Sequence, residues 1–381
     1  MKSGWAIKKL GEVCEEVKDR TSSIGVVLSA YITTDNMLKD CAGVCEAENL
    51  PPKVTNLVKF RKGDVLLSNI RPYLKKVWLA DRDGGASSDV IVFRACSKEI
   101  HPRYIWQALA RDEFFNYSML NVSGTKMPRG KREWIKQFEI PIPPLPEQKR
   151  IVAKIDAAFE KIDKLKANAE RNLKNAKELF QSALDEAMRP KKGWVEKRLG
   201  EVGPVCMCKR ILKSETNESG GVPFYKIGTF GKTPNAYISE ETYRRYRELY
   251  KFPRKGEILI SAAGTIGRTV VYDGEPAYFQ DSNIVWIAND ETKVSNAYLQ
   301  WYYKTSPWCV TKGATIPRLY NDNITSAAIA IPPIAEQRQI VKRLDFLAEK
   351  VKLLEQHYTR QIADCAEMRQ AVLREAFEGR L

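Results

Sequence analysis

Apolar side chains recur at alternating steps of four and three residues in two long stretches of the chain. The first stretch follows Pro146 and the second follows Pro333. Steps of this kind place apolar side chains along one stripe of a helix, as in coiled coils. We therefore predict long helices over residues 147–190 and 336–381. The residues expected to pair the helices are Ile151, Ile155, Ile162, Leu165, Ile340, Leu344, Leu347, Val351 and Leu354.

A single helix of this length would leave its apolar stripe exposed to water, so each stripe needs a partner. The simplest partner for each stripe is the other one, and burial in the core of a larger domain is the alternative. Parallel pairing would bring the two preceding globular regions to one end and make them collide. We therefore expect a pair of long antiparallel coiled-coil helices with pseudo-twofold symmetry, entered through the prolines at Pro144 and Pro333.

The regions before the two helices have a different pattern. Short runs rich in β-branched residues, such as 64–68 and 257–261, are bounded by Gly, Pro, Asn and Asp, which is typical of strands. Helical stretches over 102–116 and 296–305 separate these runs, so the predicted class is α+β. The predicted segments are globular domains over 1–146 and 191–335 and helices over 147–190 and 336–381.

The second half of the chain repeats the first. The segment GWAIKKLGEV, which begins at Gly4, reappears as GWVEKRLGEV from Gly193, 189 positions later. The segment IPIPPLPEQ from Ile140 reappears as IAIPPIAEQ from Ile329 at the same offset, and GTKMPR from Gly124 has a counterpart there too. Three matching pairs of segments with the same offset indicate an internal duplication. Their diverged contents suggest one scaffold that carries two different recognition surfaces.

The excess of positive charge lies mainly on the globular domains. The chain has 62 Lys and Arg against 47 Asp and Glu, a formal net charge of +15. Residues 1–146 hold 23 basic and 17 acidic side chains, and residues 191–335 hold 20 and 14, whereas the helices are almost neutral. Such a surplus predicts a polyanionic partner, usually nucleic acid, and a solvated lysine-rich surface is the alternative.

Basic side chains interleaved with aromatic and small residues form clusters at corresponding places in both halves. Arg and Lys bind phosphates or guanine edges, and Asn pairs with adenine edges, although each cluster alone is also compatible with a solvated surface. The candidate DNA-binding residues are Asn69, Arg71, Tyr73, Lys75, Lys76, Lys126, Arg129, Lys131, Arg132, Arg244, Arg245, Arg247, Thr265, Arg268, Lys312, Arg318, Tyr320 and Asn321.

Several protein classes find no support in the sequence. No apolar run approaches the roughly 20 residues of a membrane helix, and the first residues lack the apolar segment of a secretory signal. The eight cysteines form no CxxC pair, and only His101 and His357 are present. We therefore expect no metal site and no Ser-His-Asp triad, with His101 alone left open as a functional histidine. The segment 124–132 departs from a phosphate-binding loop by one extra residue and by Arg132 in place of Ser or Thr.

These features resemble the specificity subunit of type I restriction-modification systems. The resemblance rests on a proline-rich entry followed by Glu-Gln and a long helix, which occurs at 142–152 and again at 331–341. It also rests on the openings at Trp5 and Trp194 and on the closing segment 376–381, and it covers the whole chain.

The resemblance implies two target recognition domains separated by two conserved helices, with each domain recognising one half of a gapped double-stranded DNA sequence. It implies two methyltransferase (M) subunits, which bring S-adenosylmethionine, and restriction (R) subunits, which bring ATP- and Mg²⁺-dependent translocation and cleavage. The specificity subunit itself is expected to hold no cofactor, to catalyse nothing and to be cytoplasmic.

Two other interpretations stay open at this point. One is an enzyme in which a nuclease or methyltransferase is fused to a recognition domain. The other is a stand-alone double-stranded DNA-binding scaffold or regulator that is not tied to a methyltransferase. Activity of the purified chain would favour the first, and the absence of a co-purifying methyltransferase would favour the second.

Overall fold

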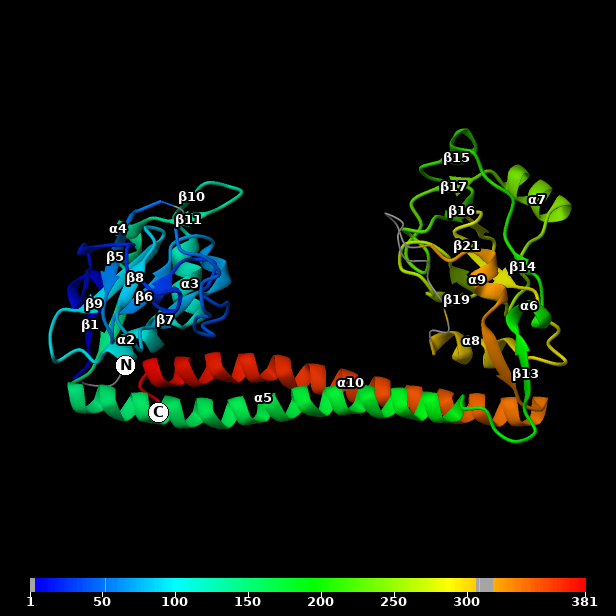
Figure 1. Cartoon of the computed structure of the whole chain (residues 1–381). Coiled ribbons are helices and arrows are strands. Elements are labelled where there is room, and N and C mark those ends of the chain that lie inside the picture. Colours follow the sequence, from blue (N-terminus) through cyan, green and yellow to red (C-terminus); the bar gives the residue numbers. More distant parts are fainter. Residues whose placement is uncertain (1–3, 52, 306–307, 309–317) are drawn as a thin grey trace. The chain divides into compact units, whose positions relative to one another are not determined.

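The computed structural model describes residues 4–51, 53–305, 308 and 318–381. The chain divides into two compact units, the first made of residues 1–171 and 358–381 and the second of residues 172–357. Each unit contains one globular domain and parts of the two long helices (Figure 1). The long helices are α5 (Leu145–Ala187) and α10 (Ile334–Phe377), so each begins two residues before its predicted start.

The globular part of the first unit, which we call the first domain, has two four-stranded sheets, one two-stranded sheet and a hairpin. The four-stranded sheets have the orders β2-β9-β6-β7 and β3-β5-β8-β4. The strands are β1 (Ala6–Lys9), β2 (Cys14–Glu16), β3 (Arg20–Ser22), β4 (Tyr31–Ile32), β5 (Asn56–Phe60), β6 (Val65–Ser68), β7 (Val77–Leu79), β8 (Gly84–Ala86), β9 (Val90–Ala95), β10 (Val122–Ser123), β11 (Arg129–Gly130) and β12 (Glu139–Ile142). The helices are α1 (Leu10–Val13), η1 (Leu28–Ala30), η2 (Pro72–Leu74), α2 (Pro102–Leu109), α3 (Asp112–Met119) and α4 (Arg132–Ile135).

The globular part of the second unit, the second domain, has four-stranded sheets of orders β14-β21-β18-β19 and β15-β17-β16-β20. The strands are β13 (Val195–Arg198), β14 (Val205–Cys206), β15 (Thr216–Asn217), β16 (Val222–Tyr225), β17 (Tyr237–Ile238), β18 (Ile258–Ser261), β19 (Thr269–Val271), β20 (Tyr278–Phe279), β21 (Ile284–Ile287) and β22 (Ala328–Ile331). The helices are α6 (Leu199–Val202), η3 (Lys213–Glu215), α7 (Glu240–Leu249), α8 (Asn296–Lys304) and α9 (Asn321–Thr325).

The strand pairing confirms the duplication. Strand β1 pairs antiparallel with β12 in the register Ala6–Ile142, and β13 pairs antiparallel with β22 in the register Val195–Ile331. Both residues of the second pair lie 189 positions after those of the first. The sheet β2-β9-β6-β7 likewise corresponds to β14-β21-β18-β19. The α+β class is therefore built twice on one topology.

The sheet β2-β9-β6-β7 of the first domain is buried on both faces of β6 and β9. Val65, Leu67 and Ile91 belong to a core shared with α2, α3 and the long helices. The alternate residues Leu66 and Val92 belong to a second core, formed with the other four-stranded sheet. Because successive side chains of a strand point to opposite faces, these strands need apolar residues at every position.

The predicted helix over 102–116 is two helices. The chain breaks at Arg111, which has an extended backbone and begins α3. The buried Arg111 guanidinium lies 4.7 Å from the ring centroid of Phe377, and the backbone N–H of Asp112 donates to Gln370 Oε1 at 2.9 Å. The break therefore packs on the end of α10, a contact that local periodicity does not encode.

The two long helices pack antiparallel in each unit. In the first unit the beginning of α5, with Ile155 and Phe159, shares a core with Leu373 near the end of α10. In the second unit the end of α5, with Leu184, shares a core with Leu344 near the beginning of α10. The antiparallel pairing predicted from the heptads is thereby confirmed.

The predicted stripe is not buried along its whole length. Ile151, Ile155 and Ile162 are buried, and so are Ile340 and Leu344. Leu347 and Val351 are half-buried, whereas Leu165 and Leu354 are 55% and 41% exposed, which departs from the prediction. A straight helix has 3.6 rather than 3.5 residues per turn, so heptad positions drift by about 20° per repeat. Ala169, Ala176 and Cys365 are the buried residues in the middle of the helices.

A buried glutamine ties the first turn of each long helix to its own domain. Gln148 Nε2 donates to the carbonyl oxygens of Pro143 at 2.8 Å and Glu99 at 3.0 Å, and its Oε1 accepts from the backbone N–H of His101 at 2.9 Å. Gln337 makes the corresponding bonds to Pro332, Lys293 and Ser295, at 2.9, 2.8 and 2.9 Å. This buried network explains why a glutamine follows the prolines at the same place in both halves.

Replacing Gln148 with Ala should destabilise the first unit by roughly 2–4 kcal/mol, because it leaves a backbone N–H and two carbonyl groups unsatisfied. Hydrogen exchange measured on peptides that contain Glu99 to His101 and the start of α5 would detect the loss. The matched control is Gln137→Ala, which changes an exposed glutamine of the same domain. Equal protection in both variants would contradict the role assigned to Gln148.

Replacing Ile155 with Asp should destabilise the helix pair by more than about 3 kcal/mol, because it buries an unpaired carboxylate. Ile155 is fully buried, whereas Leu165 on the same helix is 55% exposed. The control Leu165→Asp should therefore change the free energy of unfolding by only about 0.5 kcal/mol. Urea unfolding followed by circular dichroism tests both, and similar midpoints for the two variants would refute this packing.

Candidate nucleic-acid interface

Two segments of the first domain join to form one surface, which we call the first loop surface and define as residues 69–76 and 123–132. Ile70 forms a β-bridge with Arg129, and the Arg71 N–H donates to the carbonyl oxygen of Pro128 at 2.7 Å. The β10–β11 hairpin of this surface lies on the side of the first domain away from α5 and α10 (Figure 1). The two basic clusters of the first half are thus brought together.

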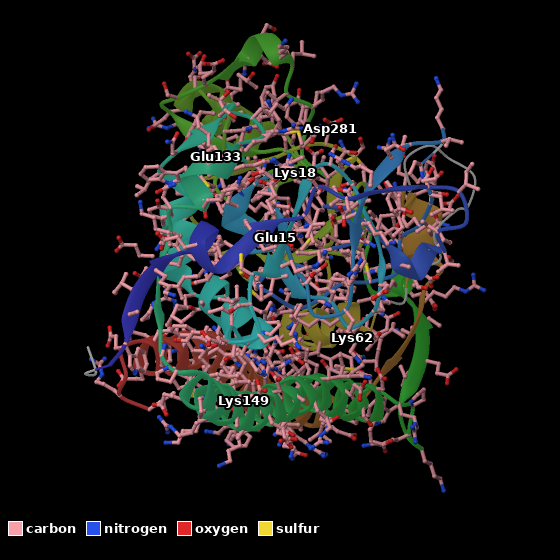
Figure 2. All side chains as sticks on the ribbon, turned by 90° about the vertical axis from the view of Figure 1, so that its left-hand side faces the viewer. Glu15, Lys18, Lys62, Glu133, Lys149 and Asp281 are labelled. Carbon is pink, nitrogen blue, oxygen red and sulfur yellow. The ribbon has the colours of Figure 1, made fainter. Side chains whose placement is uncertain are left out.

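Four candidate side chains of the first loop surface are exposed. They are Tyr73, Lys126, Arg129 and Lys131. Arg129 is also 3.3 Å from the carboxylate of Asp89. Charged side chains of both signs also lie elsewhere on this unit, among them Glu15, Lys18 and Lys149 (Figure 2).

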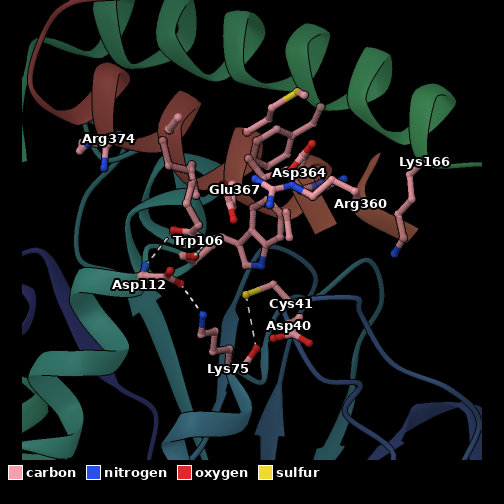
Figure 3. Close-up of a pocket in the computed structure, with 18 residues that line it drawn as sticks. Asp40, Cys41, Lys75, Trp106, Asp112, Lys166, Arg360, Asp364, Glu367 and Arg374 are labelled. Atoms are coloured by element: carbon pink, nitrogen blue, oxygen red, sulfur yellow. Dashed lines mark hydrogen bonds and ion pairs between the residues drawn. The ribbon is translucent and has the colours of Figure 1, made fainter. Parts of the chain in front are cut away.

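Three other candidate cations form internal contacts instead. Lys75 Nζ is 2.6 Å from Asp112, in the wall of a cavity of about 890 Å³ between the first domain and α10 (Figure 3). Lys76 Nζ donates to the carbonyl oxygen of Thr34 at 2.5 Å, and burial lowers the pKa of this ammonium. Arg132 donates to Glu16 and, at 2.6 Å, to the carbonyl oxygen of Ser88.

The contact of Arg132 belongs to a small ion network. Burial by itself would raise the pKa of Glu16, but hydrogen bonds from Lys136 and Arg132 outweigh it and hold the pKa below its usual value. Lys136 Nζ is 2.8 Å from Glu16. Part of the positive charge of the first domain is therefore neutralised inside the domain.

The remaining two candidates of this surface are neither fully exposed nor paired. Asn69 is buried, and its backbone N–H donates to the carbonyl oxygen of Asp89 at 2.8 Å, while its side-chain Oδ1 has no hydrogen-bond partner. Arg71 is half-buried, and its Nε is likewise buried without a partner.

The second domain builds the same joint between two segments. Ala263 forms a β-bridge with Arg318, and the Leu319 N–H donates to the carbonyl oxygen of Ala262 at 2.8 Å. We call residues 262–268 and 318–321 the second loop surface. Thr265, Tyr320 and Asn321 are exposed there, and Arg268 Nη1 donates to the carbonyl oxygen of Phe230 at 3.0 Å. Lys312 lies outside the described residues.

The bridge arginines of the two domains differ in their acidic neighbours. Arg129 pairs with Asp89 in the first domain, but the counterpart of Asp89 in the second domain is the neutral Asn283. Within the described residues, Arg318 Nη2 contacts a carbonyl oxygen instead, that of Ser282 at 3.3 Å, and its guanidinium lies 6.0 Å from the ring centroid of Tyr320. The described residues therefore place a carboxylate beside Arg129 but none in hydrogen-bond contact with Arg318.

The three arginines of α7 are not joined to the second loop surface. Arg244 pairs with Glu240 at 3.0 Å, Arg245 lies 5.1 Å from the ring centroid of Tyr246, and Arg247 donates to the hydroxyl of Tyr243 at 3.2 Å. Among the described residues no hydrogen bond or ion pair links them to the second loop surface.

Three basic residues that sequence reasoning missed lie near the second loop surface. Arg210, Lys213 and Lys226 line a cavity of about 260 Å³ together with Ser282 and Asn283, and Arg210 Nε is 2.9 Å from the carboxylate of Asp281. Lys213 and Lys226 each stand alone between uncharged neighbours in the sequence, so no cluster pointed to them. Only the fold, which places η3 and β16 beside Ser282 and Asn283, brings these basic residues together.

The described residues contain no group of three or more His, Cys, Asp or Glu side chains able to hold a metal ion. His101 begins α2, its backbone N–H belongs to the Gln148 network, and burial lowers the pKa of its imidazole. No helix within the described ranges is long and apolar enough to cross a membrane.

Comparison with known proteins finds the same duplication. The model of the type I restriction modification DNA specificity domain matches residues 2–175 and again residues 191–362. A putative type I restriction enzyme specificity subunit of Haemophilus influenzae, S.HindORF215P, is 46% identical over 253 residues, which cover 65% of this chain and 64% of that protein. The EcoDI specificity subunit of Escherichia coli is 29% identical over 131 residues, which cover 34% of this chain and 29% of that protein. The chain thus spans less than two thirds of the length of both relatives.

Two solved structures resemble the whole chain. One, described as "Structural basis underlying complex assembly and conformational transition of the type I R-M system", has 25% identity and a TM-score of 0.82, and covers 100% of this chain and 99% of its own. The other, the HsdS subunit from Thermoanaerobacter tengcongensis, has 26% identity and a TM-score of 0.60, and covers 100% and 98%. Because the family match extends over both domains and most of both long helices, the chain belongs to the family of type I restriction-modification DNA specificity subunits.

Proposed function

We propose that this chain recognises a bipartite, gapped sequence in double-stranded DNA, with one half-site for each domain. The observation that carries the proposal is the duplicated loop joint, in which the Ile70–Arg129 bridge recurs as the Ala263–Arg318 bridge. Each joint presents basic and aromatic side chains, which bind phosphates and base edges. The net positive charge of both domains supports the same partner.

The long helices would act as a spacer between the domains and as a docking surface for two M subunits. R subunits would then bind to this assembly. Large apolar side chains remain exposed along both helices, among them Leu179, Phe346 and Leu353, and exposed apolar side chains are typical of protein interfaces. The assembly named in the description of one similar structure supports such partners. The M subunits would bring S-adenosylmethionine, and the R subunits ATP and Mg²⁺.

In this proposal the chain catalyses nothing itself and works in the cytoplasm, where the DNA is. The relatives are named specificity subunits, which supports recognition rather than chemistry. The alternative is a stand-alone DNA-binding scaffold. Purification of the chain from its host separates the two, because only the proposed subunit brings a DNA methyltransferase with it.

Replacing both Lys126 and Lys131 with Ala should weaken DNA binding and make it less dependent on salt. Each lost phosphate contact lowers the slope of log affinity against log salt by about 0.9, so the slope should fall by up to about 1.8. Fluorescence anisotropy with a duplex at several salt concentrations measures this slope. The matched control, Lys154→Ala with Lys161→Ala, removes the same charge from exposed positions of α5 and should keep the wild-type slope. A slope that does not change in the first variant removes the hairpin from the interface.

Lengthening both helices should widen the gap between the half-sites. Seven residues inserted after Asn172 and after Gln361 preserve the heptad phase and add about 10 Å at 1.5 Å per residue. B-DNA advances about 3.4 Å per base pair, so the gap should grow by about three pairs, with some loss of affinity from the altered twist. Sequencing of methylated sites in cells with the complete system gives the gap directly.

Two outcomes of this experiment count against the proposal. One is a change of the half-site sequences while the gap stays the same. The other comes from a domain exchange: replacing residues 191–335 by another recognition domain should alter one half-site, and a change in both would contradict the assignment of one half-site to each domain.

A further inference from the structure

Two residues of the first loop surface hold an unfavourable backbone conformation. Arg71 has φ 50° and Lys75 has φ 51°, and they flank the short helix η2. The left-handed region is unfavourable for residues with a Cβ, because the Cβ approaches the carbonyl oxygen. Non-glycine residues kept in this region concentrate at functional sites, where the surrounding structure imposes the conformation.

The second domain has glycine at both corresponding places. Gly264, with φ 65°, follows the bridge residue Ala263 as Arg71 follows the bridge residue Ile70. At the other end of the loop Gly267, with φ 78°, precedes Arg268, whose carbonyl oxygen accepts from Ser261 as that of Lys76 accepts from Ser68. The fold therefore needs two left-handed residues in this loop, and glycine provides them without strain.

Lys75 makes contacts within the domain that account for a lysine at this position. Its ammonium is paired with Asp112, and its carbonyl oxygen accepts from the Cys41 N–H at 2.8 Å and from Cys41 Sγ at 3.4 Å (Figure 3). These contacts connect η2 to α3 and to the Asp40–Cys41 turn. These contacts of Lys75 stabilise the domain and offset the cost of its left-handed backbone conformation.

The side chain of Arg71 has no such role. No hydrogen bond or ion pair joins its guanidinium to any residue in the described part of the chain, and its Nε is buried without an acceptor. Arg71 is also one of the positive charges that help burial lower the pKa of the Lys76 ammonium, a smaller effect than that of Asp35, which raises it. Backbone strain and an unsatisfied donor both oppose an arginine here, so we look for its benefit outside the chain.

We propose that Arg71 determines sequence specificity by binding the edge of a guanine in the half-site recognised by the first domain. The inference rests on the proposed function. Its side chain is half-buried and its Nε is enclosed, which limits the positions open to the guanidinium and favours the fixed geometry of a bidentate contact to guanine O6 and N7. The exposed Lys126 and Lys131 suit phosphates, which carry no sequence information.

The variant Arg71→Gly separates folding from recognition. Glycine is the residue of the second domain at this place, so the melting temperature should stay the same or rise by up to about 5 °C. Preference for G·C over other pairs at one position of one half-site should fall roughly ten- to a hundred-fold, and the other half-site should not change. Sequencing of methylated sites in cells that carry the complete system, and anisotropy with single-pair variants of the wild-type site, measure these effects.

The control is Lys75→Gly, which relieves the same strain but loses the pair with Asp112. It should leave the recognised sequence unchanged, without the gain in melting temperature. A uniform loss of affinity in Arg71→Gly with a lower salt slope would identify a phosphate contact and overturn the inference. An unchanged sequence, or a clearly lower melting temperature, would also overturn it. A wild-type system that methylates no defined sequence would instead refute the proposed function itself.

Discussion

The hydrogen bonds of one buried glutamine per domain determine how each long helix leaves its domain. Gln148 and Gln337 each satisfy two carbonyl groups and one backbone N–H that would otherwise be buried without partners. Their carbonyl partners come from the proline segment and from the loop before α2 or α8, so strand, loop and helix meet at one side chain. Any displacement of the helix from its domain would break three hydrogen bonds at once. A chain that positions a recognition surface through a helix needs such a rigid connection.

The same requirement for satisfied polar groups divides the positive charge between structure and function. In sequence, the clusters that contain Lys75, Lys76 and Arg132 look like those that contain Lys126 and Lys131. In the structure, however, the first three donate to Asp112, Thr34 and Glu16, respectively. An occupied ammonium gains less from a phosphate, since it must first give up an existing partner. Fewer of the candidate cations of the first domain are therefore exposed than the sequence suggests, and the exposed ones, Lys126, Arg129 and Lys131, lie on the hairpin or next to it.

The duplication shows which features both domains share and which belong to one domain alone. Both domains keep the β-bridge between loops, the left-handed backbone and the glutamine network. They differ in the side chains placed on that frame, as with Asp89 opposite Asn283. The bridge between the loops is held by backbone hydrogen bonds in both domains, so it tolerates such changes of side chain. Two different recognition surfaces can therefore evolve on one topology.

The sequence by itself determined the duplication, the α+β class, the long helices and the segments that form the basic loops of each domain. Repeats and periodicity are local properties of the chain, so they can be read without the fold. It did not determine which cations are free, since Lys75 meets Asp112 across 37 residues and Arg132 meets Glu16 across 116. Nor did it reveal the break at Arg111 or the exposure of Leu165, which follow from packing on α10 and from the drift of heptad positions along a straight helix. Only the tertiary structure decides such contacts, because an ion pair or a buried stripe depends on distances between segments that no local pattern contains.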